Sequence, residues 1–217
     1  MNKNIRSLIL LSTVFLYCCK GYKISTVPTE TQTHTGSKKT LDNLQKETDE
    51  NTQKIITLTA DEKKKFNSLK HALNQVIEKL QDQIGGCKDV SKNKCTNFIT
   101  WINGNIQKQK ELVEAFTTSY NFLEDKRKKY EDNKDFNTYI SNAIDCKANN
   151  QINQCNNDNK YGNGTNEIEQ FFRGILNDMS IRNTNEEMFD CIKDGLTREN
   201  SHWGGLKGWQ EIIIQEK

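Results

Sequence analysis

The sequence lacks the short motifs that mark the common enzyme classes. It contains no glycine-rich phosphate loop, no H-E-x-x-H and no G-x-S-x-G. Its three histidines are far apart in the chain, at His34, His71 and His202. A nucleophilic pair could still assemble in space, for example from Cys191 with His71 or His202, but no spacing favours such a pair. We therefore expect a protein that is not an enzyme and that carries no cofactor.

Metal-ligand spacing and an excess of one charge are missing too. The C-x₂-C spacing of structural zinc sites does not occur, and the histidines do not cluster with the cysteines, so we expect no metal. Lys and Arg number 31 against 29 Asp and Glu, and removing residues 1–18 would take away Lys3 and Arg6. The remaining chain would be close to neutral, and nothing in it calls for a nucleic-acid partner.

Large apolar residues are scarce in the stretch that begins at residue 20 and ends before residue 58. This stretch is rich in Thr, Gln, Lys and Glu, and it holds Pro28, the one proline of the chain. Such a segment buries too little surface to offset the entropy lost on ordering. We interpret residues 19–57 as a disordered tether, and about 40 residues of this kind have an end-to-end distance of roughly 35 Å.

The N-terminus, in contrast, contains a short apolar run that ends in two cysteines. Residues 8–19 follow the cationic Lys3 and Arg6, and the chain becomes polar directly after Cys19. A cationic start and an apolar stretch of this length are typical of a secretory signal and are too short for a membrane-spanning helix. The terminal cysteines favour a bacterial lipoprotein signal, in which the last cysteine is acylated.

Two cysteines compete for that lipid. Cys19 follows the small Cys18 and has Leu16 three positions upstream, whereas Cys18 follows the bulky Tyr17. Since signal peptidases need small side chains before the cut, we predict that residues 1–18 form the signal peptide. Cys19 would then carry the lipid and anchor the chain to a membrane. An ordinary secretory signal is the alternative, although no A-x-A-like site follows.

From Leu58 onward, apolar residues recur at three- and four-residue steps, which indicates amphipathic helices. Two capping boxes, at residues 59–62 and 184–187, predict helix starts, and Gly85 and Gly86 predict a stop. Further helices are expected from about Thr96, around residues 136–144 and over residues 166–180. The segment 201–205 is expected to end the last helix, and the tail 209–214 fits a helical turn or a strand. The sequence predicts an all-α fold, a helical bundle of about five helices over residues 58–217, with a single core.

A basic run lies near the end of the predicted second helix. Residues 107–110 of this predicted helix are polar and suggest either an exposed face or a kink. The basic run itself suits the C-terminal end of the helix, where the helix dipole favours cations. A solvated helix end explains it, but four cations beside an aromatic ring could also steer and anchor an acidic or sulfated partner. We therefore predict a ligand-binding surface at Lys126, Arg127, Lys128, Lys129 and Tyr130, with the loop 149–165 as the second choice.

Five cysteines remain beyond the signal. Cys87 and Cys95 flank one polar turn, and Cys146 and Cys155 bracket an Asn-rich turn. An exported protein permits disulfides, and each of these pairs would remove about 2–3 kcal/mol of unfolded-chain entropy. We predict these two bridges. For Cys191, a buried thiol and an intermolecular disulfide are the two alternatives.

Several helical segments together with the lipoprotein start resemble the plasmid-encoded surface lipoproteins of Borrelia, of the Mlp type. The resemblance covers most of residues 58–198 and rests on residues 58–70, 77–80, 83–87, 106–112 and 168–174. It implies an outer-membrane, surface-exposed location and a host-facing role. Similar relapsing-fever lipoproteins capture the complement regulator factor H, and some bind plasminogen.

We accordingly expect a tethered surface lipoprotein that binds host proteins, with factor H as the first choice and plasminogen as the second. One alternative is a surface antigen of the same family with another host ligand or none. Another alternative is a structural lipoprotein of the envelope.

Overall fold

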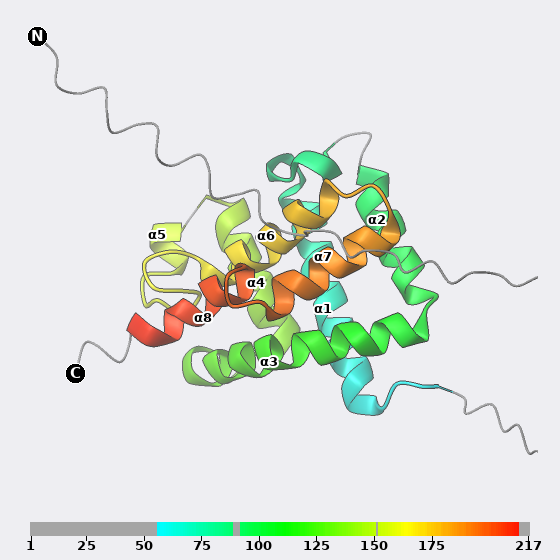
Figure 1. Ribbon diagram of the computed structural model, residues 1–217. Coiled ribbons are helices and arrows are strands. Elements are labelled where there is room, and N and C mark those ends of the chain that lie inside the picture. Colours follow the sequence, from blue (N-terminus) through cyan, green and yellow to red (C-terminus); the bar gives the residue numbers. More distant parts are fainter. Residues whose placement is uncertain (1–55, 89–91, 151, 213–217) are drawn as a thin grey trace, which may run out of the picture. The chain divides into compact units, whose positions relative to one another are not determined.

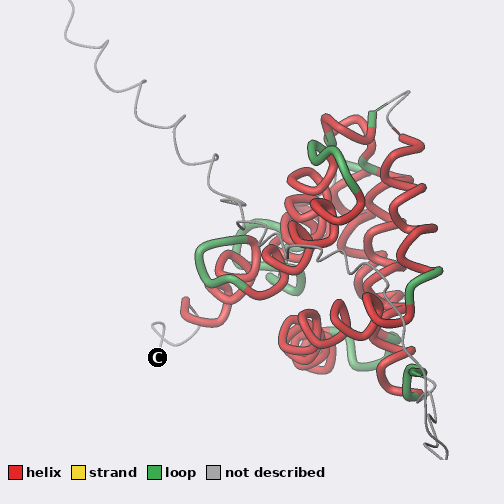
Figure 2. Tube along the Cα trace, turned by 45° about the vertical axis from the view of Figure 1, so that its right-hand side comes forward, coloured by secondary structure: helices red, strands yellow, loops and turns green. Residues whose placement is uncertain are grey.

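The computed structural model of the protein describes residues 56–88, 92–150 and 152–212 (Figure 1). The predicted signal peptide, the lipidated Cys19 and the tether up to residue 55 lie outside the described residues. The described part consists of helices and connecting loops and contains no strand (Figure 2). The all-α prediction is therefore confirmed. The α-helices are α1 (Ala60–Lys79), α2 (Lys92–Asn103), α3 (Ile106–Tyr130), α4 (Phe136–Ala148), the short α5 (Ile152–Cys155), α6 (Glu167–Ser180), α7 (Asn185–Thr197) and α8 (His202–Ile212). Two short 3-10 helices, η1 (Gln81–Gln83) and η2 (Gly85–Cys87), follow α1, so α1 ends before the two glycines expected to stop it.

Both predicted capping boxes open helices. The Thr59 hydroxyl accepts a hydrogen bond from the Glu62 amide at 3.2 Å, and the Glu62 carboxylate accepts one from the Thr59 amide at 2.7 Å. Thr184 and Glu187 form the same pair of bonds at the start of α7, both at 3.2 Å. Each box satisfies backbone donors that a helix start would otherwise leave without partners.

The predicted second helix is divided into α2 and α3. Between them, the Asn105 side chain accepts from the Lys108 amide at 3.1 Å and caps α3. The Gln109 side chain reaches back and donates to the carbonyls of Ile102 at 3.0 Å and Asn103 at 2.8 Å, at the end of α2. The polar residues 107–110 thus lie in the first turns of a new helix, and Gln109 is buried as the partner of two carbonyls.

Helix α1 occupies a central place in the packing. It lies against α2, α3, α4 and α6, while α6 also packs against α7 and α8. The apolar stripe predicted for α1 is buried, and it joins aromatic rings from α3, α4 and α6 in one core. The largest of these fully buried rings belong to Phe116, Tyr139 and Phe172.

The C-terminal segment differs from the prediction. Residues 201–205 were expected to end a helix, but α7 ends at Thr197 and α8 begins at His202, with Gly204 and Gly205 inside it. Trp203, Leu206 and Trp209 are buried along one side of α8, so tertiary packing overrides the poor helix propensity of glycine. Up to Ile212 the ambiguous tail is helical, and residues 213–217 lie outside the described residues.

The structure joins Cys87 to Cys95 and Cys146 to Cys155, with 5.8 Å between the Cα atoms of each pair. This is the pairing that the sequence predicts. Cys191 is buried in α7 and belongs to neither bridge. One bridge closes the connection between α1 and α2, and the other closes the Asn-rich turn after α4.

Candidate functional site

Lys126, the first residue of the basic run, is part of the protein interior. Only 8% of its surface is exposed. Its ammonium nitrogen lies 4.1 Å from the centre of the Trp209 ring and 5.1 Å from that of Phe122. Burial, with a smaller effect from the charge of Lys129, lowers the pKa of Lys126 to about 8. This side chain therefore helps to join α3 to α8 and is not available to a ligand in this state.

Arg127 is also engaged within the protein. Its guanidinium forms two hydrogen bonds of 2.8 Å to the Glu124 carboxylate. Another of its nitrogens donates to the carbonyls of Asp132 at 3.1 Å and Lys134 at 2.6 Å. Arg127 thus fixes the turn of residues 131–135 against the end of α3.

The remaining members of the basic run are more accessible. Lys128 and Lys129 are exposed, and Lys129 also lies 5.0 Å from the centre of the Tyr130 ring. Tyr130 is half-buried and stacks on Trp209, with 6.1 Å between ring centres and 14° between ring planes. The expectation of four exposed cations on one surface is therefore corrected, since Lys126 and Arg127 are engaged internally. Successive helix residues are about 100° apart around the axis, so four in a row cannot share one face.

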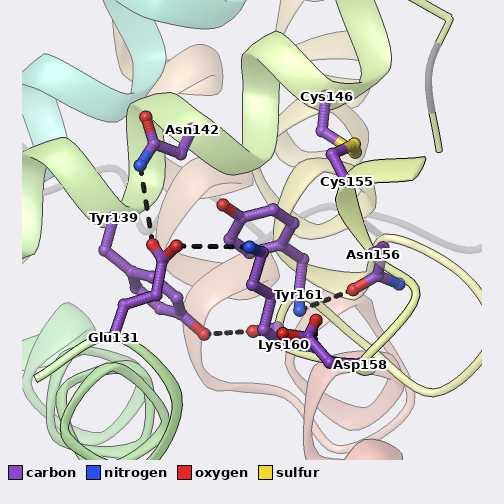
Figure 3. Close-up of polar contacts among 9 residues, drawn as sticks. All are labelled: Glu131, Tyr139, Asn142, Cys146, Cys155, Asn156, Asp158, Lys160 and Tyr161. Atoms are coloured by element: carbon purple, nitrogen blue, oxygen red, sulfur yellow. Dashed lines mark hydrogen bonds and ion pairs between the residues drawn. A yellow bond between two sulfur atoms is a disulfide. The ribbon is translucent and has the colours of Figure 1, made fainter.

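The loop named as the second choice lies directly beside this helix end. The Lys160 ammonium contacts the Glu131 carboxylate at 3.4 Å, and Asn142 of α4 donates to the same carboxylate at 3.5 Å. The Tyr139 hydroxyl donates to the Lys160 carbonyl at 2.5 Å (Figure 3). The structure thus brings together two regions that the sequence suggests separately. We call this region the α3–loop end: residues 126–135, 149–150 and 152–165.

Within the loop, the buried Asn156 side chain holds the backbone in place. Its oxygen accepts from the Tyr161 amide at 2.8 Å, and its nitrogen donates to the carbonyls of Gly162 at 3.1 Å and Thr165 at 2.8 Å. The Cys146–Cys155 bridge holds the start of the same loop to α4 (Figure 3). A run rich in asparagine is therefore a fixed structure, and sequence reasoning missed the role of Asn156 because neighbouring asparagines look alike in sequence.

Replacing Asn156 with alanine is expected to lower the free energy of unfolding by about 2 kcal/mol, because three backbone groups lose their partner. Its exposed neighbour Asn157 provides the matched control, and Asn157→Ala should change stability by less than about 0.5 kcal/mol. Urea denaturation measures both values. Equal stabilities for the two variants would contradict the role given to Asn156.

Two buried tyrosines, Tyr161 of the loop and Tyr139 of the adjacent α4, resist ionisation. Burial, reinforced by neighbouring acidic groups, raises the pKa of both Tyr139 and Tyr161 well above the usual value. Because the folded state holds these protons more tightly than the unfolded chain, their contribution to stability is fully present below about pH 10 and is lost as the pH rises further.

Above pH 10, the free energy of unfolding is expected to fall by about 1.4 kcal/mol per pH unit for each of these tyrosines. Denaturation at pH 8 and pH 11 tests this with Tyr139→Phe, which should lose about 1 kcal/mol at pH 8 and decline less steeply. Because the pKa of Lys126 is lowered, this residue makes the free energy of unfolding increase as the pH rises from about 8 to 10. The increase is the same in the parent protein and in Tyr139→Phe, so it cancels when the two are compared. Parallel declines would contradict the assignment to Tyr139.

A second feature is a polar groove of about 380 Å³ between the start of α1 and α3. Three of its carboxylates are ion-paired with lysines: Asp61 with Lys65, Glu62 with Lys110, and Glu111 with Lys193. Its charges are thus largely compensated within the protein. In the part of the chain that the structure describes, no three side chains of the metal-ligating types gather around one point.

The histidines considered for catalysis have other partners. His71 lies 2.7 Å from the Ser141 hydroxyl, and His202 lies 2.9 Å from the Asp178 carboxylate. His34 lies outside the described residues. Among residues 56–212, apart from 89–91 and 151, no helix is both long enough and apolar enough to span a bilayer.

The chain is similar to bacterial lipoproteins over nearly all of its length. It is 46% identical to lipoprotein MlpJ of Borreliella burgdorferi over 209 residues, which cover 96% of this chain and 99% of that protein. It is 38% identical to lipoprotein MlpB of the same organism over 208 residues, covering 94% and 97%. No solved structure matches this chain significantly.

The sequence model of the Mlp lipoprotein family matches residues 31–192. The chain therefore belongs to the Mlp lipoprotein family, which confirms the resemblance stated above. Membership of this family indicates a membrane-anchored lipoprotein.

Proposed function

We propose that this protein is an outer-surface lipoprotein that holds its helical domain away from the membrane through Cys19 and the tether, and that binds a host serum protein at the α3–loop end. Factor H is the ligand suggested by the resemblance to relapsing-fever lipoproteins. The contact surface is suggested by the structure.

The observation that carries this proposal is the joining of the loop to the end of α3. The Lys160–Glu131 ion pair joins the loop to the residue that follows α3, while the Tyr139 hydrogen bond and the Cys146–Cys155 bridge hold the loop to α4. A fixed surface loses little conformational entropy on binding a partner. Among its exposed side chains are Lys128, Lys129, Asp132, Lys134 and Asp158, whose mixed charges favour a complementary protein surface.

Binding at this surface is tested by surface plasmon resonance with residues 20–217 and immobilised factor H, with plasminogen as the second analyte. The double variant Lys128→Ser/Lys129→Ser is expected to weaken binding by about twofold to tenfold per lysine, and more so at low salt. Lys126 and Arg127 are left unchanged because their replacement would disturb packing.

The matched control is Lys63→Ser/Lys64→Ser, which removes two adjacent exposed lysines from the first turn of α1. Its affinity should equal that of the parent protein. Absence of factor H binding by the folded parent would defeat the ligand assignment. Equal losses in both double variants would show only a general charge effect and would defeat the proposed surface.

Surface exposure has its own test. Protease added to intact cells should remove the domain, whereas a structural lipoprotein facing the periplasm would be protected until the outer membrane is opened.

A further inference from the structure

Helix α8 covers two of the five residues in the basic run. The Trp209 ring lies over the Lys126 ammonium at 4.1 Å and stacks on Tyr130. Trp209 itself is only 2% exposed. The Phe122 ring packs edge-on against both Trp203 at 5.8 Å and Trp209 at 6.1 Å. By helix periodicity, Lys126 and Tyr130 lie on the same side of α3 as the exposed Lys129, so they would extend the surface around Lys129 if α8 moved away.

The composition of α8 makes it a weak helix by itself. It has three glycines among 11 residues, and glycine is the least favourable helix residue after proline. Packing requires Gly204, because a Cβ atom there would lie 1.7 Å from the Glu199 carbonyl oxygen. Gly205 and Gly208 have nothing within 4 Å of the position of a Cβ atom. These two glycines lower helix stability without any packing requirement, so α8 depends on the docking of its buried side chains.

The connection between α7 and α8 is exposed, and α8 is held to the domain chiefly by its packing on α6, with His202 2.9 Å from the Asp178 carboxylate, and by the contact of Trp209 with Lys126. Arg198, Glu199 and Asn200 are exposed and lie outside both helices. The Ser201 hydroxyl lies 3.0 Å from the Asp194 carbonyl and 3.3 Å from that of Gly195. These contacts stabilise the end of α7 independently of the residues that dock α8.

We propose that α8 is an autoinhibitory strap: docked, it masks Lys126 and Tyr130, and undocked, it lets both residues join Lys129, on the same side of α3, in contacting an acidic partner. The strap regulates the α3–loop end, so its effect on binding rests on the proposed function. The movement itself can be measured without any ligand.

The test is the rate of acetylation of Lys126 by acetic anhydride at fixed pH, followed by peptide mass spectrometry on residues 20–217. In Gly205→Ala/Gly208→Ala, which strengthens α8 without touching Lys126, the rate is expected to fall by about fivefold to thirtyfold. In Leu206→Ala, which removes a buried contact of α8, it should rise on the order of tenfold or more. The exposed Lys128 is the internal control and should react equally in all three proteins.

Alkylation of the buried Cys191 in the same samples reports opening of the core. If the acetylation rate of Lys126 does not change, α8 does not undock, and the strap is overturned. If it changes in parallel with the alkylation rate of Cys191, α8 opens only when the whole domain opens, and the strap is also overturned. If Leu206→Ala fails to fold, the glycine double variant still decides.

Factor H binding gives the second readout. The glycine double variant should bind more weakly, by at most about fivefold to thirtyfold, because a smaller fraction of molecules presents Lys126 and Tyr130 in addition to the exposed side chains. Equal binding by parent and variant would overturn the regulatory role. Absence of binding by every version would defeat the proposed function, while the Lys126 rates would still decide the strap.

Discussion

Replacing Gly86 with alanine is expected to lower the free energy of unfolding by about 3 kcal/mol or more. A Cβ atom at this position would lie 2.3 Å from the backbone carbonyl oxygen of Ser180, at the end of α6. The Gly86 amide also donates to the Ser180 hydroxyl at 3.2 Å, so the two backbones would have to separate and weaken that bond. Overpacking against backbone is costly because no flexible side chain can yield.

The adjacent Gly85 is the matched control. Nothing lies within 4 Å of the position of its Cβ atom, so Gly85→Ala should leave stability almost unchanged. Thermal denaturation by circular dichroism should show a midpoint about 6–12 °C lower for Gly86→Ala alone. Equal midpoints would mean that the turn shifts freely and that this close approach does not hold the segment Gly85–Cys87 against the end of α6.

Removing the Cys146–Cys155 bridge as the double alanine variant is expected to cost about 3 kcal/mol, from the loop-closure entropy that the unfolded chain regains. Hydrogen exchange of the amides in residues 149–165 should also accelerate. Hydrogen exchange of the amides in α2 and α7 should accelerate only as much as the lower free energy of global unfolding requires.

The Cys87–Cys95 bridge provides the comparison, because its sequence separation of 8 is close to the 9 of the other bridge. Its removal should cost a similar free energy without selective exchange in residues 149–165. If both double variants show the same pattern of exchange, the Cys146–Cys155 bridge does not fix the loop and the argument for a preformed surface fails.

Local signals in the sequence predict most of the helical framework. The two capping boxes and the apolar stripes of α1 and α6 depend on residues within one helix, and both disulfides close short polar turns. The division between α2 and α3 depends on Gln109 reaching back to the carbonyls of Ile102 and Asn103, which no periodicity reveals. Likewise, α8 forms because other parts of the chain provide a surface that buries the side chains of Trp203, Leu206 and Trp209.

The candidate site was predictable in place but not in detail. The basic run and the Asn-rich loop are visible as composition, and the structure shows that they adjoin. Which cations remain accessible depends on partners outside the run: the distant Trp209 for Lys126, and the carbonyls of the following turn, at Asp132 and Lys134, for Arg127. Helix geometry alone already limits how many neighbouring cations can face one partner.

The central packing of α1 has a mechanical consequence. The chain before Ile56 joins the domain at the first turn of α1, a helix with α2, α3, α4 and α6 as neighbours. A pull on that segment, such as fluid drag on a cell surface, would be opposed by all these interfaces at once. Resistance to such loading depends on the rate of unfolding more than on equilibrium stability. The C-terminal helix α8 follows these elements in the chain, so a pull applied before α1 would reach it only through the rest of the domain.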